Sequence, residues 1–165
     1  MKKISLTCGK YAIVDDDDYA SLIKYKWFAA WSGNRKWYAF RSVSKYKQEK
    51  MEHLILKPLD GFVVDHININ GLDNRRLNLR FATYSQNMAN TRKLKRRYGK
   101  CSSRYKGVDW NMLGKSWRAR ICINGRRFSL GGFKNEIDAA KAYDVAAYKN
   151  FGEFARLNLK ELPIG

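Results

Sequence analysis

Cysteine is scarce in this sequence. Three cysteines occur among 165 residues, Cys8, Cys101 and Cys122, and none of them belongs to a CxxC pair. An odd count without that spacing argues against a disulfide framework and against a zinc knuckle. We therefore expect an intracellular protein with reduced thiols.

Long apolar runs are also missing. The stretch over 1–9 is charged, and its apolar part is far too short for a signal peptide. No run elsewhere in the chain is long enough to insert into a bilayer. We therefore expect no membrane partner.

Acidic residues are few. The chain has 15 Asp and Glu against 33 Lys and Arg, which gives a formal net charge of +18 and a pI near 10.0. Such a chain is too basic for an ordinary metabolic enzyme, and its field points to a polyanionic partner. Nucleic acid is the first candidate and a membrane surface the second, although the missing apolar run counts against a membrane. The length suits one or two small domains.

The first 50 residues have a β-rich pattern. Apolar and polar residues alternate over 4–14 and over 37–43, as in half-buried strands, and a turn signal stands at 32–34. The four carboxylates at 15–18 we interpret as a solvated turn that caps a following helix, rather than as a metal site. We expect the aromatic residues of this segment to form a small core rather than to stack on bases. They are Trp27, Phe28, Trp31, Trp37 and Phe40.

The stretch over 63–90 carries the side chains best suited to chemistry. Two β-branched residues precede Asp65 and His66, a loop of Asn, Gly and Asp follows, and Asn78-Leu79-Arg80 leads into a short helical run. His can activate a water because its pKa lies near neutral, and a hard divalent cation prefers oxygen ligands such as carboxylate and amide groups. Because neighbours on a strand point to opposite faces, the sequence alone does not place Asp65 and His66 at one site.

In residue type, order and spacing, this stretch resembles the HNH endonuclease family, in particular its phage and intron-encoded branch, whose hairpin begins V-D-H-I-N. The match covers 53–90 well and 10–50 more loosely. The resemblance implies a ββα-metal fold and hydrolysis of DNA phosphodiesters. His53 resembles the first His of the family's H-R-L-I segment, but Leu54 follows it where the family has Arg. We expect His53 to pack against the hairpin.

The resemblance also implies site residues, position by position. Asp65 is a metal ligand, His66 is the general base, and Asn78 pins the loop and orients that base. Asn87 is the second metal ligand, with Asn90 as a close alternative on a similar helix face. The motif therefore reads H-N-N rather than H-N-H. Such an oxygen-rich site favours Mg²⁺ or Mn²⁺ over Zn²⁺.

No acidic residue occurs over 75–106. We interpret the arginines of the hairpin as phosphate contacts, with a solvated face as the alternative; they are Arg75, Arg76 and Arg80. We interpret the next stretch, over 92–103, as a linker that is extended, or helical only at its start, and that lies along the DNA backbone, with a merely solubilising linker as the alternative. Its expected contacts are Arg92, Lys93, Arg96 and Arg97.

The pattern changes after residue 102. Strict alternation over 117–123 predicts a strand with one apolar face, and Asn124-Gly125 predicts a tight hairpin to a return strand. Asn135 is the predicted cap of a helix over 136–149. The result is a three-stranded antiparallel sheet backed by one helix. Its other face carries arginines suited to guanine edges in the major groove: Arg118, Arg120 and Arg127.

This region resembles the Apetala-type domain of plant ethylene-response factors. The matching elements are Y-K-G-V, W-R-A-R-I, L-G-G-F, the E-x-x-A-A-x-A-Y-D helix, and F-G with L-N-L. The resemblance implies sequence-specific DNA binding through the sheet. Asp109 stands where the family has Arg, and Ser129 aligns with a contact Trp of the family, so the target preference of the plant factors does not carry over.

The expected fold class is therefore α+β, with a β-rich segment over 1–50, a nuclease hairpin over 51–92, a basic linker over 93–102 and a DNA-binding module over 103–160. The expected function is a metal-dependent, homing-type DNA endonuclease, phage-encoded and cytoplasmic in a bacterial host. It acts on double-stranded DNA as a monomer or homodimer. One alternative is a non-catalytic DNA-binding regulator with a vestigial hairpin. Another is an RNA-binding protein, against which the lack of an exposed aromatic pair on the sheet counts.

Overall fold

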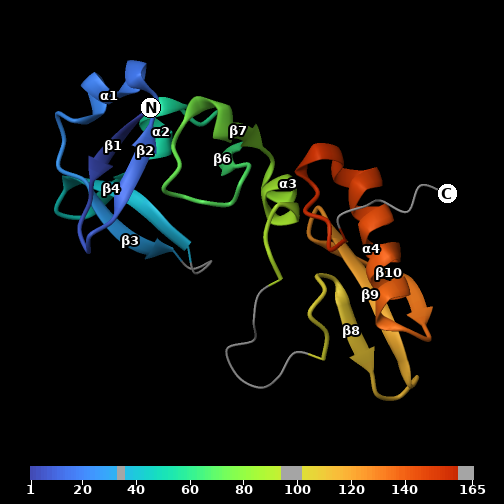
Figure 1. Cartoon of the computed structure of the whole chain (residues 1–165). Coiled ribbons are helices and arrows are strands. Elements are labelled where there is room, and N and C mark those ends of the chain that lie inside the picture. The colour runs from blue at the N-terminus through green and yellow to red at the C-terminus, as the bar shows by residue number, and fades with distance from the viewer. Residues whose placement is uncertain (33–35, 94–101, 160–165) are drawn as a thin grey trace. The chain divides into compact units, whose positions relative to one another are not determined.

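The structure is a computed structural model that describes residues 1–32, 36–93 and 102–159 (Figure 1). The chain divides into two compact units, Met1–Thr83 and Tyr84–Gly165. Both units combine small antiparallel sheets with helices, so the predicted α+β class is confirmed. Within the described ranges, no helix has the length and hydrophobicity that crossing a membrane requires.

The first unit begins with a hairpin of β1 (Lys2–Ser5) and β2 (Tyr11–Val14). The alternation over 4–14 is therefore not one strand. The chain reverses at Cys8 and Gly9, whose φ angles are +57° and +63°, a left-handed conformation that glycine adopts without strain.

Helix α1 (Asp16–Leu22) follows the hairpin with Asp15 at its N-cap, so the acidic run does begin a helix, but the expectation of a solvated run fails at the buried Asp18. Three of the four carboxylates form the first turn of the helix, where the helix dipole favours negative charge. Asp18 is buried and pairs with Arg76 at 2.7 Å, and Asp15 accepts the Arg76 backbone N–H. The acidic run thus anchors a loop that lies some 60 residues further along the chain.

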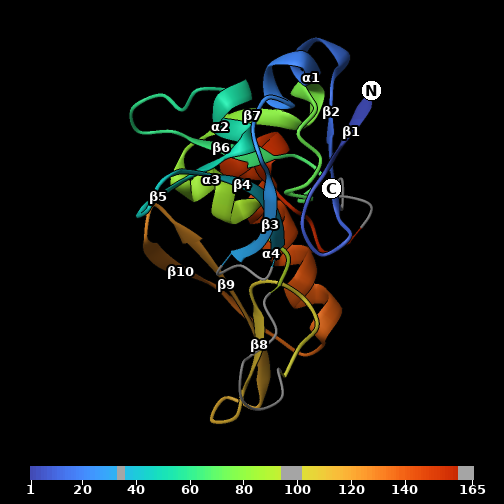
Figure 2. The same cartoon turned by 90° about the vertical axis from the view of Figure 1, so that its left-hand side faces the viewer.

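The second sheet of this unit has the order β3-β4-β5, all antiparallel (Figure 2). Its strands are β3 (Phe28–Ser32), β4 (Lys36–Ser44) and β5 (Lys47–Lys50). Ala29 and Ala39 enter the core from one face of this sheet, together with the buried Trp27. The expected aromatic core is only partly correct, because Trp31 is 58% exposed.

The candidate hairpin completes the first unit. Helix α2 (Met51–Ile55) precedes β6 (Val63–His66), and the 3₁₀ turn η1 (Arg76–Asn78) leads into β7 (Leu79–Ala82). Strands β6 and β7 pair antiparallel and place Asp65 opposite Arg80. Met51, Val64 and Leu79 join the same apolar core as β2 and β4, and this core fixes the hairpin on the unit.

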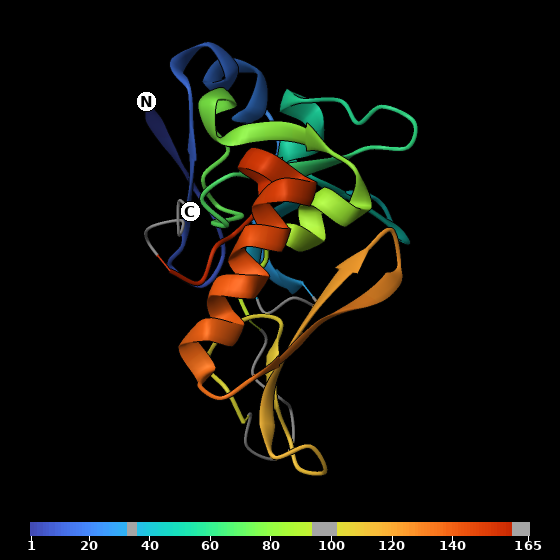
Figure 3. The same cartoon turned by 90° about the vertical axis from the view of Figure 1, so that its right-hand side faces the viewer.

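The second unit contains a three-stranded antiparallel sheet of order β10-β9-β8 with a long helix across it (Figure 3). Its elements are α3 (Tyr84–Ala89), β8 (Val108–Asn111), β9 (Ser116–Ile123), β10 (Arg126–Phe133), α4 (Glu136–Phe151) and η2 (Gly152–Phe154). The predicted cap is confirmed: the Asn135 side chain accepts the Asp138 N–H at 2.8 Å.

Small residues bring the helix close to the sheet. Ala139, Ala140 and Ala147 are buried on the sheet-facing side of α4. Gly107 has a φ of +75°, and a Cβ there would collide with the Tyr143 ring. That position therefore requires glycine both for its backbone conformation and for the approach of α4.

Helix α3 packs on this sheet and on α4. Its Ala89 packs in an apolar cluster with Ile121 and Phe151. The Lys106 ammonium donates to the carbonyls of Met88, Ala89 and Thr91 at 2.6–3.0 Å. These carbonyls lie at the C-terminal end of α3, where a cation is favourable.

Candidate functional site

The candidate base, His66, lies at the end of β6 and is buried, with 4% of its surface exposed. Its Nε2 donates to the Asn74 Oδ1 at 3.1 Å, and the Tyr38 ring meets it edge-on at a centroid distance of 5.7 Å. Burial lowers the pKa of His66 to about 4. The imidazole is therefore neutral at physiological pH, and the Asn74 bond assigns its hydrogen to Nε2 and its lone pair to Nδ1.

Asn74 is a site residue that the sequence analysis missed. It is fully buried, its backbone N–H donates to the Ile13 carbonyl at 2.8 Å, and its Nδ2 contacts the Met51 Sδ at 3.6 Å. Strand β2 and helix α2 thus hold it against His66. Its neighbours in sequence gave only a turn signal, because every one of these partners comes from elsewhere in the fold.

Asn78 closes the loop between the two strands. Its Oδ1 accepts the Asn68 backbone N–H at 3.0 Å, and its Nδ2 donates to the Asp73 carbonyl at 2.7 Å. Asn68 also donates to the Asp73 carboxylate at 2.8 Å. The loop is therefore held next to Asn74, which fits the predicted pinning role of Asn78; its part in catalysis stays a prediction.

Asp65, the predicted metal ligand, is buried at 3% exposure and accepts the Arg80 Nε at 3.1 Å. A carboxylate oxygen is a hard ligand of the kind that Mg²⁺ and Mn²⁺ bind. A cation at this carboxylate would have to share it with the Arg80 guanidinium. Within the described ranges, no three His, Cys, Asp or Glu residues gather into a metal-binding group. The expected pair of one carboxylate and one amide does not require such a group.

The three hairpin arginines all have carboxylate partners. Arg75 pairs with Asp73 at 2.6 Å, Arg76 with Asp18 at 2.7 Å and Arg80 with Asp65 at 3.1 Å. Hydrogen bonding to Arg75 lowers the pKa of Asp73. As described, these guanidiniums stabilise the loop, and their contact with phosphate stays a prediction.

Two asparagines on the segment after β7 were predicted as alternatives for the second metal ligand. Asn87 lies on α3 and is half-buried, whereas Asn90 lies just beyond the helix and is buried. Both belong to the second unit and Asp65 to the first. The choice between them, and the shared metal site itself, stay predictions.

The predicted linker contacts fall into three groups. Arg92 is exposed. Lys93 is half-buried, and its ammonium donates to the carbonyls of Tyr105 and Val108 at 2.7 Å, so it holds the start of β8. Arg96 and Arg97 lie outside the described residues.

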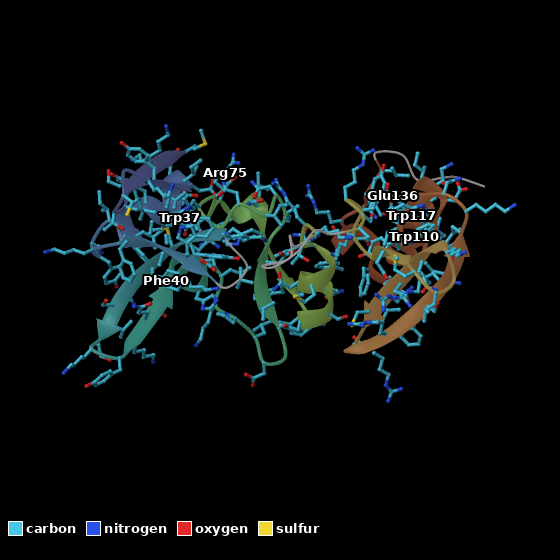
Figure 4. All side chains as sticks on the ribbon, turned by 90° about the horizontal axis from the view of Figure 1, so that it is seen from below. Trp37, Phe40, Arg75, Trp110, Trp117 and Glu136 are labelled. Atoms are coloured by element: carbon cyan, nitrogen blue, oxygen red, sulfur yellow. The ribbon has the colours of Figure 1, made fainter. Side chains whose placement is uncertain are left out.

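The arginines predicted to read DNA lie on the face of the β8–β10 sheet that is turned away from α4. Asp109 bridges two of them, accepting from Arg118 Nη2 and Arg120 Nη2 at 2.7 Å each. Arg127 is exposed on β10, opposite Cys122 in the register. On the same unit, Trp110 and Trp117 meet edge-on at 5.1 Å and lie close together in Figure 4. The acid at position 109 thus fixes two guanidiniums side by side.

Comparison with known proteins places both regions in families. The family model described as HNH endonuclease matches residues 57–89, and the one described as AP2 domain matches residues 103–153. The chain is 31% identical over 153 residues to an uncharacterised HNH endonuclease of Acanthamoeba polyphaga mimivirus, covering 91% of this chain and 75% of that protein. No solved structure matches the chain.

Two plant proteins match about a third of the chain. They are dehydration-responsive element-binding proteins 2C and 2H of Arabidopsis thaliana, 45% and 44% identical over 60 and 62 residues. These alignments cover 35% and 36% of this chain but only 17% and 39% of the plant proteins. The chain therefore belongs to the HNH endonuclease family and contains an AP2 domain, which confirms both resemblances seen in the sequence.

Proposed function

We propose that this protein is a metal-dependent DNA endonuclease whose AP2 domain selects the site to be cut. The observation that carries the proposal is the state of His66: a buried, neutral imidazole, held by Asn74 and adjacent to Asp65, within the region that matches the HNH family. A neutral imidazole in a fixed orientation is what a general base requires.

In this proposal, His66 removes a proton from a water aligned with the scissile phosphorus. Asn74 fixes the ring orientation, and Asn78 holds the loop on which Asn74 lies. Asp65 and Asn87 would hold one Mg²⁺ or Mn²⁺ ion, since their oxygen donors fit such a hard cation. When bound, the ion would supply charge neutralisation for the hydrolysis. The products carry a 5′-phosphate and a 3′-hydroxyl, as the family resemblance implies.

The AP2 domain supplies the target preference. The plant relatives are named for binding a dehydration-responsive element, and the sheet here presents arginines on the face that α4 leaves open. We propose that β6, β7 and α3 form the ββα-metal arrangement of the nuclease, and that residues 51–92 and 103–160 act as its catalytic and DNA-reading domains. The enzyme acts on double-stranded DNA as a monomer that nicks or as a homodimer that cuts both strands, in the cytoplasm of a bacterial host.

The His66→Ala variant tests the chemical step. We expect it to lose Mg²⁺-dependent cleavage while DNA binding stays within a few-fold of wild type, because the domain that reads the target is untouched. His53→Ala is the matched control, since His53 is half-buried on α2 and has no assigned role; it should cleave normally. Cleavage by His66→Ala at the wild-type rate contradicts the proposal.

One observation favours a second function, a DNA-binding regulator with a vestigial hairpin. The Asp65 carboxylate is occupied by Arg80, and this pairing opposes metal binding at that position. In a regulator, wild-type protein and His66→Ala would bind the same site equally well, and neither would cut it in Mg²⁺ or Mn²⁺.

A further inference from the structure

The β3–β4–β5 sheet has one face in the core and one face outside it. Ala29 and Ala39 point into the core of the first unit. Their strand neighbours point the other way, because side chains alternate along a strand. These neighbours are Phe28, Tyr38 and Phe40, with Lys50 paired opposite Phe40. We call these four residues the aromatic face; all are partly exposed, and none belongs to the core cluster.

The aromatic face leads to the candidate base. The rings of Phe28 and Phe40 stack at a centroid distance of 6.1 Å, and Phe40 meets Tyr38 edge-on at 6.4 Å. Tyr38 in turn meets the His66 ring at 5.7 Å. The Lys50 ammonium lies over the Tyr38 ring, 4.4 Å from its centroid. The Lys50 ammonium and the three rings therefore form a continuous row from the His66 imidazole onto the sheet. Figure 4 labels Phe40, which lies on β4.

Cations are needed beside the site, since DNA brings a phosphate at every nucleotide. The hairpin arginines are paired, Arg75 and Arg76 at 2.6–2.7 Å to nearly buried carboxylates. Lys50 has a looser partner: its ammonium is 3.6 Å from Glu52, and burial raises the pKa of that carboxyl to about 7. Among these cations, Lys50 is therefore the easiest to transfer to a phosphate.

We propose that the aromatic face is a DNA-binding surface for the duplex beside the scissile phosphate. Lys50 contacts a backbone phosphate, and Tyr38, Phe40 and Phe28 pack against the sugars that follow it. Duplex DNA fits better than a protein partner, because the face is continuous with the ring of the proposed base and carries a cation at that end. This inference rests on the proposed function and gives the β3–β4–β5 sheet a role in it.

Salt dependence of binding tests the lysine in the full-length protein, with EDTA present so that no cleavage occurs. Lys50→Gln should bind the cognate duplex several-fold more weakly and lower the slope of log K against log salt by about one. Lys50→Arg should keep the wild-type slope. Lys47→Gln is the matched control: it removes the same charge from the same strand, on the opposite face. Equal slopes for Lys50→Gln and wild type overturn the proposal.

A photocrosslink tests the rings without relying on that charge. Phe40 is replaced by p-benzoylphenylalanine, and the full-length protein is irradiated with labelled duplex in EDTA. The proposal expects a crosslink to DNA within a few nucleotides of the position that Mg²⁺ later shows to be cut. Crosslinking only to protein, whether a second copy or the same chain, overturns it. If wild-type protein never cuts, the nuclease proposal fails, while the salt slope and the DNA crosslink still decide whether this face binds DNA.

Discussion

At the scale of residues, the buried carboxyl of Glu52 in the first unit has an unusual environment. Glu52 on α2 is 1% exposed, its Oε1 lies 3.6 Å from the Lys50 ammonium, and its Oε2 has no hydrogen-bond partner among the described residues. Burial raises its pKa to about 7 from the ordinary 4.5. An ionised carboxylate in that place is costly, because the side chain is buried and the Lys50 ammonium at 3.6 Å offsets that burial only in part.

Glu52→Gln should therefore stabilise the first unit at alkaline pH. Between pH 4.5 and 7 the unfolded carboxyl is ionised while the folded one keeps its proton, so wild-type stability falls as pH rises through this window and stays reduced above it. The variant avoids this loss. The difference in free energy of unfolding between the variant and wild type should therefore rise in favour of the variant from pH 4.5 to pH 8, by up to about 3 kcal/mol.

Urea unfolding at pH 4.5 and pH 8 measures the gain, and Trp27 in the core is a suitable fluorescent reporter. Glu49→Gln, a change of the same kind on a side chain that is one-third exposed, is the control and should show no alkaline gain. If the stability of Glu52→Gln relative to wild type is no higher at pH 8 than at pH 4.5, burial does not raise the pKa of the Glu52 carboxyl as described.

Sequence indicated some of the site residues and could not indicate others. Asp65, His66 and Asn78 stand in a local pattern of types and spacings, and the structure places them on the paired strands and the loop between them. Asn74 could not be found in this way, because its partners Ile13 and Met51 are remote in sequence. The same holds for the pairing of Arg76 with Asp18, 58 residues away.

At the scale of elements, the β9–β10 hairpin was the most predictable part of the fold. Alternation over 117–123 placed Ala119 and Ile121 on the buried face, and Asn124-Gly125 takes positive φ at both positions, as a tight hairpin turn requires. The irregular pairing between Ser129 and Gly131 was not predicted. Gly131 has a φ of +115° at this place, a conformation that the alternation of residues does not specify.

Arg118→Ala combined with Arg120→Ala should abolish site preference. Asp109 holds both guanidiniums on the open face of the sheet, where we propose that they contact base edges. We expect the ratio of specific to non-specific affinity to fall by at least about tenfold, since each good base contact contributes roughly 1–3 kcal/mol. Footprinting and competition with random DNA measure this ratio.

The hairpin should be unaffected by that double change, so cleavage of short duplexes at high protein concentration is the internal control. It should continue at close to the wild-type rate. A double variant with an unchanged footprint would show that another surface reads the sequence.

At the scale of the whole molecule, the chain joins a region of the HNH endonuclease family to an AP2 domain, under a net charge of +18. The sequence predicted both parts and their order. The sequence did not predict the division between Thr83 and Tyr84. Helix α3 lies within the region that matches the nuclease family, but its Ala89 packs on α4 and β9. Helix α3 thus belongs to one unit by sequence family and to the other by contact.

The most direct test of the account is a cleavage assay on a supercoiled plasmid that carries the bound site, using the wild-type chain in Mg²⁺ and in EDTA. We expect relaxation or linearisation that requires the metal, with a nicked product for a monomer and a linear one for a dimer. Tight binding at that site without any cleavage, in Mg²⁺ and again in Mn²⁺, would contradict the account and identify the protein as a regulator that keeps the form of a nuclease without its chemistry.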